Sequence, residues 1–197
     1  RLVKTLHTWN SGMSIQEEVK RLASEQRRPP WQPEMPTGVD EATITAFEDR
    51  TGLPVPPALR EWLKFSNGPQ IGVAGTLGID TAHPQCSVES YYEDQMFPKW
   101  QQMGWIPFAR DGFGNYYVIT TREHEGPGNP VFFVECVGDP YGNELTYVVA
   151  SDVWHFLRFY IGQELGEDGW PFDHKKVLAQ DPALAKNTAA PRPWELR

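Results

Sequence analysis

The stretch that decides the fold is Trp105-Ile106-Pro107-Phe108-Ala109-Arg110-Asp111-Gly112-Phe113-Gly114-Asn115-Tyr116-Tyr117-Val118-Ile119-Thr120. Its two ends, residues 105–109 and 116–120, are rich in the β-branched and aromatic residues that favour strands. The residues between them are mainly Gly, Asp and Asn, which favour tight turns. The stretch therefore predicts an antiparallel β-hairpin, in which Pro107 marks an edge strand or a bulge.

The sequence that follows the hairpin predicts two more strands and a helix. Residues 131–137 and 145–150 are apolar runs, separated by the turn-forming residues 138–143. Ser151 is placed to cap the helix, in which apolar residues recur at the spacing i, i+3, i+4, i+7 and i+8. These are Val153, Phe156, Leu157, Tyr160 and Ile161. Strands joined by such short connections pair antiparallel.

The residues before the hairpin are mainly helical. Ser14 and Glu17 form the S-x-x-E capping box of a first helix. Residues 27–36, with four prolines, are too proline-rich for a regular element and predict an extended arm.

Two further helices precede the strands. Residues 40–52 and 57–66 predict helices, the first with Asp at its N-cap and Gly at its end. Residues 71–74 and 76–79 predict two short strands.

The order of elements defines the fold class. Helices, a run of strands and a closing helix indicate an α+β fold, with a mainly antiparallel sheet of about five to six strands and helices packed on one face. We divide the chain into an N-terminal helix and Pro-rich arm (1–38), a main domain (39–183) and a C-terminal tail (184–197).

Negative charge is concentrated in the middle of the chain. The chain has a net charge of −8, and residues 1–70 and 158–197 each contain equal numbers of basic and acidic residues. Residues 71–157 contain only Lys99, Arg110 and Arg122 against eleven carboxylates. Such a segment repels nucleic acid and anionic lipid, and it attracts a basic partner. The alternative is an acidic surface that only keeps the protein soluble.

The sequence contains no enzyme motif. H-E-x-x-H, the P-loop and G-x-S-x-G are all absent. His83-Pro84-Gln85-Cys86 offers half of a metal site, and no second ligand pair completes it. The turn Asp111–Asn115 can offer N–H groups to a ligand, but its glycines are explained equally by a tight hairpin loop. We therefore expect no catalytic residue, no metal and no cofactor.

The two cysteines and the first four residues give information about the cellular compartment of the protein. Cys86 and Cys136 lie far apart in a chain large enough to fold without a disulfide, so we expect two buried, reduced thiols. No apolar run approaches the length needed to span a bilayer, and Arg1-Leu2-Val3-Lys4 has no signal-peptide apolar core. We expect a cytoplasmic protein.

Aromatic residues alternate with acidic ones around residue 95. Nucleic-acid-binding proteins combine aromatic residues with Lys and Arg, so this pattern argues against a nucleic-acid partner. Two interpretations remain open, packing in the core and anchoring of a protein partner. The aromatic residues are Tyr91, Tyr92, Phe97, Trp100 and Trp105.

Five short motifs follow one another between residues 40 and 183. They are Ile44-x-x-Phe47-Glu48-x-x-Thr51-Gly52-Leu53-Pro54-x-Pro56-x-x-Leu59 with Leu63-x-Phe65-Ser66-Asn67-Gly68; Ile106-Pro107-Phe108-Ala109-x-Asp111-Gly112-x-Gly114-Asn115-x-Tyr117; Val131-Phe132-Phe133-Val134; the helix 151–165; and Phe172-Asp173-x-x-Lys176-Val177-Leu178-Ala179-x-Asp181-Pro182. In this order they resemble the SUKH superfamily of Smi/Knr-like proteins.

The resemblance implies a fold and a type of function. The fold is α+β, with helices packed on one curved, mainly antiparallel sheet. Bacterial members are largely immunity proteins that neutralise toxins, many of them nucleases, by binding them, and fungal members are regulatory interaction proteins. No catalytic residues are attributed to the family. Residues 1–38 and 80–104 have no counterpart in its motifs, so the resemblance does not carry over a partner.

We therefore expect a protein, not an enzyme, that neutralises a basic toxin domain by stoichiometric binding. One alternative is a regulatory interaction protein that docks through residues 27–38. Another is a small-molecule hydrolase that pairs Asp111 or Glu135 with a histidine. The candidate partner-binding residues are Glu89, Tyr91, Tyr92, Glu93, Asp94, Trp100, Trp105, Asp111 and Asn115.

Overall fold

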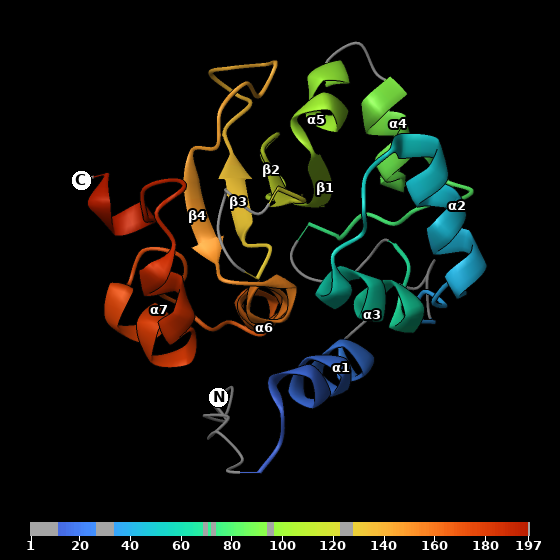
Figure 1. The fold of residues 1–197 in the computed structure, drawn as a ribbon. Coiled ribbons are helices and arrows are strands. Elements are labelled where there is room, and N and C mark those ends of the chain that lie inside the picture. Colours follow the sequence, from blue (N-terminus) through green and yellow to red (C-terminus); the bar gives the residue numbers. More distant parts are fainter. Residues whose placement is uncertain are drawn as a thin grey trace.

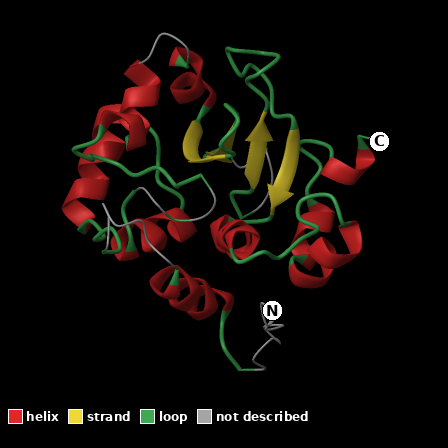
Figure 2. Ribbon diagram, turned by 180° about the vertical axis from the view of Figure 1, so that it is seen from behind, coloured by secondary structure: helices red, strands yellow, loops and turns green. Residues whose placement is uncertain are grey.

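A four-stranded sheet lies among helices in the computed structural model (Figures 1 and 2), which describes residues 12–26, 34–68, 71, 74–93, 97–122 and 128–196. In these residues the strands are β1 (Trp105–Arg110), β2 (Tyr116–Thr120), β3 (Val131–Val134) and β4 (Tyr147–Ala150). The α-helices are α1 (Ile15–Glu25), α2 (Glu41–Thr51), α3 (Pro57–Phe65), α4 (Val88–Glu93), α5 (Pro98–Met103), α6 (Val153–Glu164) and α7 (His174–Gln180). Short 3-10 helices are η1 (Pro84–Cys86), η3 (Pro182–Lys186) and η4 (Pro193–Glu195). The α+β class is confirmed.

The sheet is built from the predicted hairpin. Its order is β1-β2-β3-β4, with every neighbouring pair antiparallel. β1 lies at an edge of this sheet, and its register shifts between Pro107 and Ala109. Both outcomes expected of Pro107, an edge position and a bulge, are present together, because proline has no N–H to donate to a ladder.

Five to six strands are not confirmed. Residues 76–79 make isolated bridges instead of a strand: Thr76 pairs with Ala109, and Gly78 pairs with Ser87. The segment 71–74 lies partly outside the described residues. The side chain of Asn67 replaces a partner strand for Ile79, because it accepts from the Ile79 N–H (2.9 Å) and donates to its carbonyl (2.7 Å). The Asn67 side chain thus fixes the backbone at Ile79 without a neighbouring strand.

Helices cover both faces of the sheet, which corrects the expectation of helices on one face. Consecutive strand residues point to opposite faces. On one face the Tyr117 ring lies 4.9 Å from the Phe156 ring of α6. On the other, the Tyr116 ring lies 5.3 Å from Tyr91 of α4 and 5.5 Å from Trp100 of α5. Both figures show α6 end-on while β3 and β4 are seen along their length, so the helix does not run parallel to these strands.

The predicted helix caps are largely confirmed. Ser14 and Glu17 form the capping box of α1, Asp40 accepts from the Thr43 N–H, and Gly52 ends α2 in the left-handed conformation. The cap of α6 is Asp152 and not Ser151 as predicted. Ser151 precedes the cap because its N–H donates to the buried carboxylate of Asp181, 2.7 Å away.

The C-terminal residues complete the outer edge of the sheet. The Val148 N–H of β4 donates to the carbonyl of Pro191 (3.0 Å). On the other side, the Leu77 N–H donates to the Phe108 carbonyl of β1 (2.6 Å). Both edge strands of the described sheet are therefore covered by other parts of the chain.

Helix α1 packs against α3 and α6 (Figure 1). Its buried residues, Val19, Leu22 and Ala23, belong to the same core as the sheet. The buried Arg158 of α6 joins it to the rest, since its guanidinium donates to Glu18 (2.7 Å) and to Glu167 (2.9 and 3.0 Å).

Two smaller expectations concern cysteines and membranes. Cys86 and Cys136 are both free and buried, as expected. In the described part of the chain, no helix combines the length and the apolar character that a bilayer crossing needs.

We expect the variant Arg158→Ala to lower the free energy of unfolding by about 3 kcal/mol, because it leaves the carboxylates of Glu18 and Glu167 without their buried partner. Lys176→Ala, which breaks the exposed ion pair with Asp168 (2.6 Å), is the control and costs less than about 1 kcal/mol. Urea unfolding measures both. Equal losses would contradict a structural role for the buried guanidinium.

We expect stability to fall as the pH rises above the ordinary range of histidine. Burial opposes protonation of His155, but its hydrogen bond to Asp152 (3.0 Å) and the charges of Asp152 and Asp181 outweigh burial and raise the His155 pKa. A raised pKa contributes stability below the unfolded-state pKa of about 6.5, and this contribution is lost as pH rises through the folded pKa. Urea midpoints between pH 5.5 and 8.5 measure the slope. A His155→Gln variant with the same slope would contradict it.

Candidate partner-binding surface

Three of the predicted partner-binding residues belong to the core. Trp100 is 0% exposed, and Tyr92 and Trp105 are also buried. The Tyr92 hydroxyl donates to the Trp105 carbonyl (2.9 Å). Their side chains are packed in the core, so this fold does not present them on its surface as anchors. They pack on the second face of the sheet, which the sequence analysis did not expect to be covered.

The other described residues of the 89–94 group, Glu89, Tyr91 and Glu93, have different surroundings. Glu89 accepts from Arg50 of α2 (3.0 Å) and from Ser87 (2.7 Å), so its charge is balanced within the molecule. Tyr91 is half-buried against Tyr116, and Glu93 is exposed. Asp94 lies outside the described residues.

Asp111 and Asn115 build the loop between β1 and β2. Asp111 Oδ1 accepts from the N–H groups of Phe113 (2.7 Å) and Asn115 (3.0 Å). The Asn115 amide donates to Asp111 Oδ2 (2.6 Å). Asp and Asn thus bind their own backbone, and the ring of Phe113 is left 83% exposed at the tip.

The β3–β4 connection repeats this construction. Asp139 accepts from the N–H groups of Tyr141 (3.3 Å) and Asn143 (2.8 Å), and the Asn143 amide donates back to Asp139 (3.0 Å). The tip again presents an aromatic residue, because Tyr141 is 59% exposed. The two loops share the sequence Asp-x-aromatic-Gly-Asn, at 111–115 and 139–143.

The two loops lie at the same end of the sheet. Tyr116 of β2 pairs with Val134 of β3, so the loop before β2 and the loop after β3 are neighbours. The Asn115 side chain joins them, since its Oδ1 accepts from the N–H groups of Cys136 (2.9 Å) and Val137 (3.2 Å). Figure 1 shows the β3–β4 connection extending beyond the end of the sheet that is remote from α6.

Trp100 supports the second loop from the core. Its indole N–H donates to the carbonyl of Gly142 (2.9 Å). A Cβ at Gly142, where φ is +53°, would lie 2.8 Å from the Trp100 ring and 3.0 Å from Cys136 Sγ. The buried Trp100 therefore positions the loop that carries Tyr141.

The two connections also carry several carboxylates. Asp111, Glu135, Asp139 and Glu144 all belong to the two connections, and Lys99, which donates to Asn143 (3.2 Å), is the basic residue bonded there. The backbone N–H of Asn143 lowers the pKa of the Asp139 carboxyl, which is therefore ionised at neutral pH. Burial, followed by the charges of Asp139, Glu135 and Asp111, raises the pKa of the Cys136 thiol to about 12. The Cys136 thiol therefore stays protonated at neutral pH.

Sequence reasoning missed the exposed residues Phe113, Val137 and Tyr141. A usable signal was present, because the repeated Asp-x-aromatic-Gly-Asn pattern places an aromatic side chain at each loop tip. We call the side chains of Phe113, Val137 and Tyr141, with the carboxylates of the two connections, the loop-end surface.

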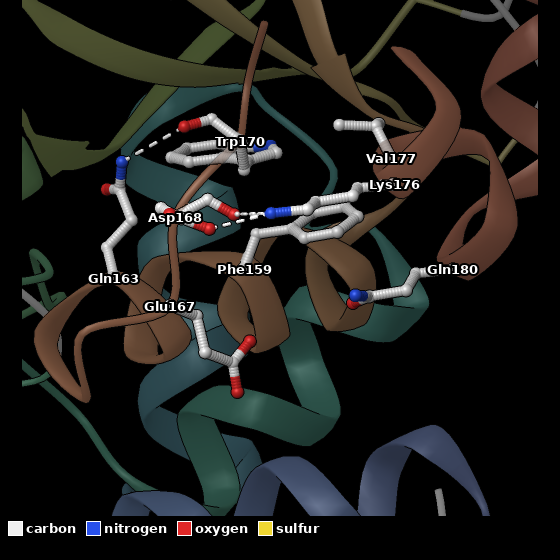
Figure 3. A pocket seen from close by; sticks show the side chains of 8 residues that line it. All are labelled: Phe159, Gln163, Glu167, Asp168, Trp170, Lys176, Val177 and Gln180. Carbon is white, nitrogen blue, oxygen red and sulfur yellow. Dashed lines mark hydrogen bonds and ion pairs between the residues drawn. The ribbon is translucent and has the colours of Figure 1, made fainter. Parts of the chain in front are cut away.

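A small pocket lies between α6 and α7 (Figure 3). About 30 Å³ of space admits a water molecule or two, not a drug-sized ligand. The figure shows the Lys176 amino group directed at Asp168 within it, where the two form an ion pair. Trp170 and Phe159 stack beside them with their rings 5.8 Å apart.

Among the described residues, the carboxylates predicted for a hydrolase, Asp111 and Glu135, bind backbone N–H groups and not a histidine. Asp111 is engaged by its own loop, and Glu135 accepts from the Gly138 N–H (2.7 Å). The histidine–carboxylate pair that the structure describes, His155 with Asp152, caps α6 and does not line the pocket. Among the described residues no group of three or more His, Cys, Asp or Glu side chains is placed to hold a metal ion.

The structure is an α+β protein in which two neighbouring loops at one end of the sheet present exposed apolar side chains. A model of the SMI1 / KNR4 family (SUKH-1) matches residues 38–158. These residues include helices α2 to α5, all four strands of the described sheet and the N-terminal half of α6. The chain belongs to this family. No curated protein matches its sequence. Helix α1 and the C-terminal elements α7, η3 and η4 lie outside the matched residues.

We expect Gly142→Ala to lower the free energy of unfolding by roughly 2–4 kcal/mol, because the added Cβ overpacks against Trp100 and adopts a left-handed φ. Gly166→Ala is the matched control, since Gly166 also has a positive φ (+84°) but nothing lies within 4 Å of its Cβ position. It costs about 1 kcal/mol. Urea unfolding compares the two, and equal losses would show that Trp100 does not constrain the loop.

Proposed function

We propose that this protein neutralises a basic protein toxin by binding it stoichiometrically, as an immunity protein does. The observation that carries the proposal is the loop-end surface, where the two connections carry four carboxylates and three exposed apolar side chains in a member of the SMI1 / KNR4 family. Exposed aromatic residues are the usual anchors of protein interfaces. Negative charge around them favours a positively charged partner.

The mechanism follows from these two properties. The carboxylates steer a basic toxin domain toward the surface and raise the association rate. The apolar side chains lose their contact with water in the complex and slow dissociation. The bound protein then blocks the path of the substrate to the toxin, without a chemical step of its own.

The test is co-expression with the product of a neighbouring toxin-like gene. We expect a 1:1 complex, protection of the host cell from the toxin, and an association rate that falls about tenfold between low and high salt. Capture of no neighbouring product, with binding behaviour independent of salt, would contradict the proposal. A 1:1 complex with a non-toxic regulatory partner would contradict it in favour of the regulatory alternative.

A charge variant separates steering from contact. We expect Glu135→Gln/Glu144→Gln to slow association with the toxin roughly threefold and to leave dissociation nearly unchanged. Asp49→Asn on α2, an exposed carboxylate of another surface, is the control and should leave both rates unchanged. Stopped-flow measurements give the two rates.

A further inference from the structure

Exposed aromatic side chains at two loop tips are held in the same way. In each loop an Asp side chain accepts two backbone N–H groups and an Asn amide, so the conformation of the tip is fixed before any partner arrives. Asn115 ties the first loop to the start of the second connection, and Trp100 holds Gly142 from below. Rigid loops lose little conformational entropy on binding, so Phe113 and Tyr141 are preorganised for contact.

Val137 extends this apolar surface next to the first loop. It is 68% exposed, and a Cβ built at Gly114 would lie 3.6 Å from Val137 Cγ2. Of the six exposed large hydrophobic side chains among the described residues, three therefore lie on the two connections. Large apolar side chains that gather on a surface mark interaction sites more often than scattered ones do.

The charges on the same connections select the partner. Asp111 binds Asn115, whose side chain accepts from the Cys136 and Val137 N–H groups. Glu135 accepts from the Gly138 N–H, next to Asp139, so these carboxylates lie close together at the base of the two loops. A partner residue that stacks on the rings therefore also meets carboxylates. Arginine satisfies both demands, because its planar guanidinium stacks on aromatic faces and binds carboxylates with two parallel hydrogen bonds. Lysine is a compact point charge and satisfies only the second.

We propose that Phe113 and Tyr141 form a two-pronged receptor for an arginine-bearing segment of the partner protein. The inference rests on the proposed function, since it specifies how a basic partner is held. The guanidinium groups stack on the two rings, the carboxylates of the two connections pair with them, and Val137 covers the aliphatic part of the arginine side chains.

The test titrates the full chain, labelled with ¹⁵N, with a synthetic peptide of six arginines alternating with glycines. We expect chemical-shift changes in residues 111–115 and 135–146. A peptide in which lysine replaces every arginine has the same charge, and we expect it to bind at least threefold more weakly, because ammonium groups stack poorly on the rings. Absence of shifts in these loops, or equal affinity for both peptides, would overturn the inference.

Matched variants assign the effect to the rings. We expect F113A/Y141A to weaken arginine-peptide binding about tenfold, and F113L/Y141L to weaken it nearly as much, because leucine keeps apolar area but has no π-system. L196A removes a side chain with 55% exposure from the C-terminal tail and should have no effect. Unchanged affinity in F113L/Y141L would overturn the stacking role. The spectra of the variants themselves show whether each remains folded.

Different experimental results would contradict the two-pronged receptor and the proposed immunity function. If the toxin is neutralised equally by the wild type and F113A/Y141A, the two-pronged receptor is wrong and the immunity function stands. If the loops bind the arginine peptide while no basic toxin is captured, the receptor stands and the immunity function fails.

Discussion

Strand β2 is buried on both faces, and the arrangement of the rest follows from this constraint. Tyr116 and Tyr117 are consecutive and therefore point to opposite faces, each into a cluster of aromatic rings. Helix α6 supplies one cluster, and α4 and α5 with Phe97 supply the other. The edges of the sheet are occupied by residues 76–77 and by Pro191. The described chain thus leaves an end of the sheet for exposed connections, and both loops of the loop-end surface lie there.

Local signals predicted much of the fold. The capping residues Ser14, Asp40 and Gly52, and the hairpin around Pro107, depend on interactions within a few residues, so the sequence carries them directly. The sequence did not reveal that α4 and α5 cover a second face, because this requires contacts such as that between Trp100 and Gly142, 42 residues apart. For the same reason the sequence leaves open whether Trp100 and Trp105 pack in the core or anchor a partner, and the structure buries both.

The ion pairs in the structure also change how the charge distribution along the sequence is interpreted. The sequence places all of the net negative charge in residues 71–157. In the structure Glu89 of that segment pairs with Arg50, which lies outside it, and Asp152 pairs with His155. A count of charged residues along the sequence therefore overstates the negative electrostatic field of residues 71–157. Asp111 and Asp139 instead accept from backbone N–H groups of their own loops, which carry no formal charge, and Lys99 lies nearby, bonded to Asn143.

The hydrogen bond from Val148 to Pro191 limits how the sheet can grow. The carbonyl of Pro191 accepts the outward N–H of Val148 in β4, and the chain at Pro191 is not itself a strand. The edge of β4 is therefore covered by a segment that does not extend the sheet. An edge covered in this way is less open to edge-to-edge pairing with another copy of the protein.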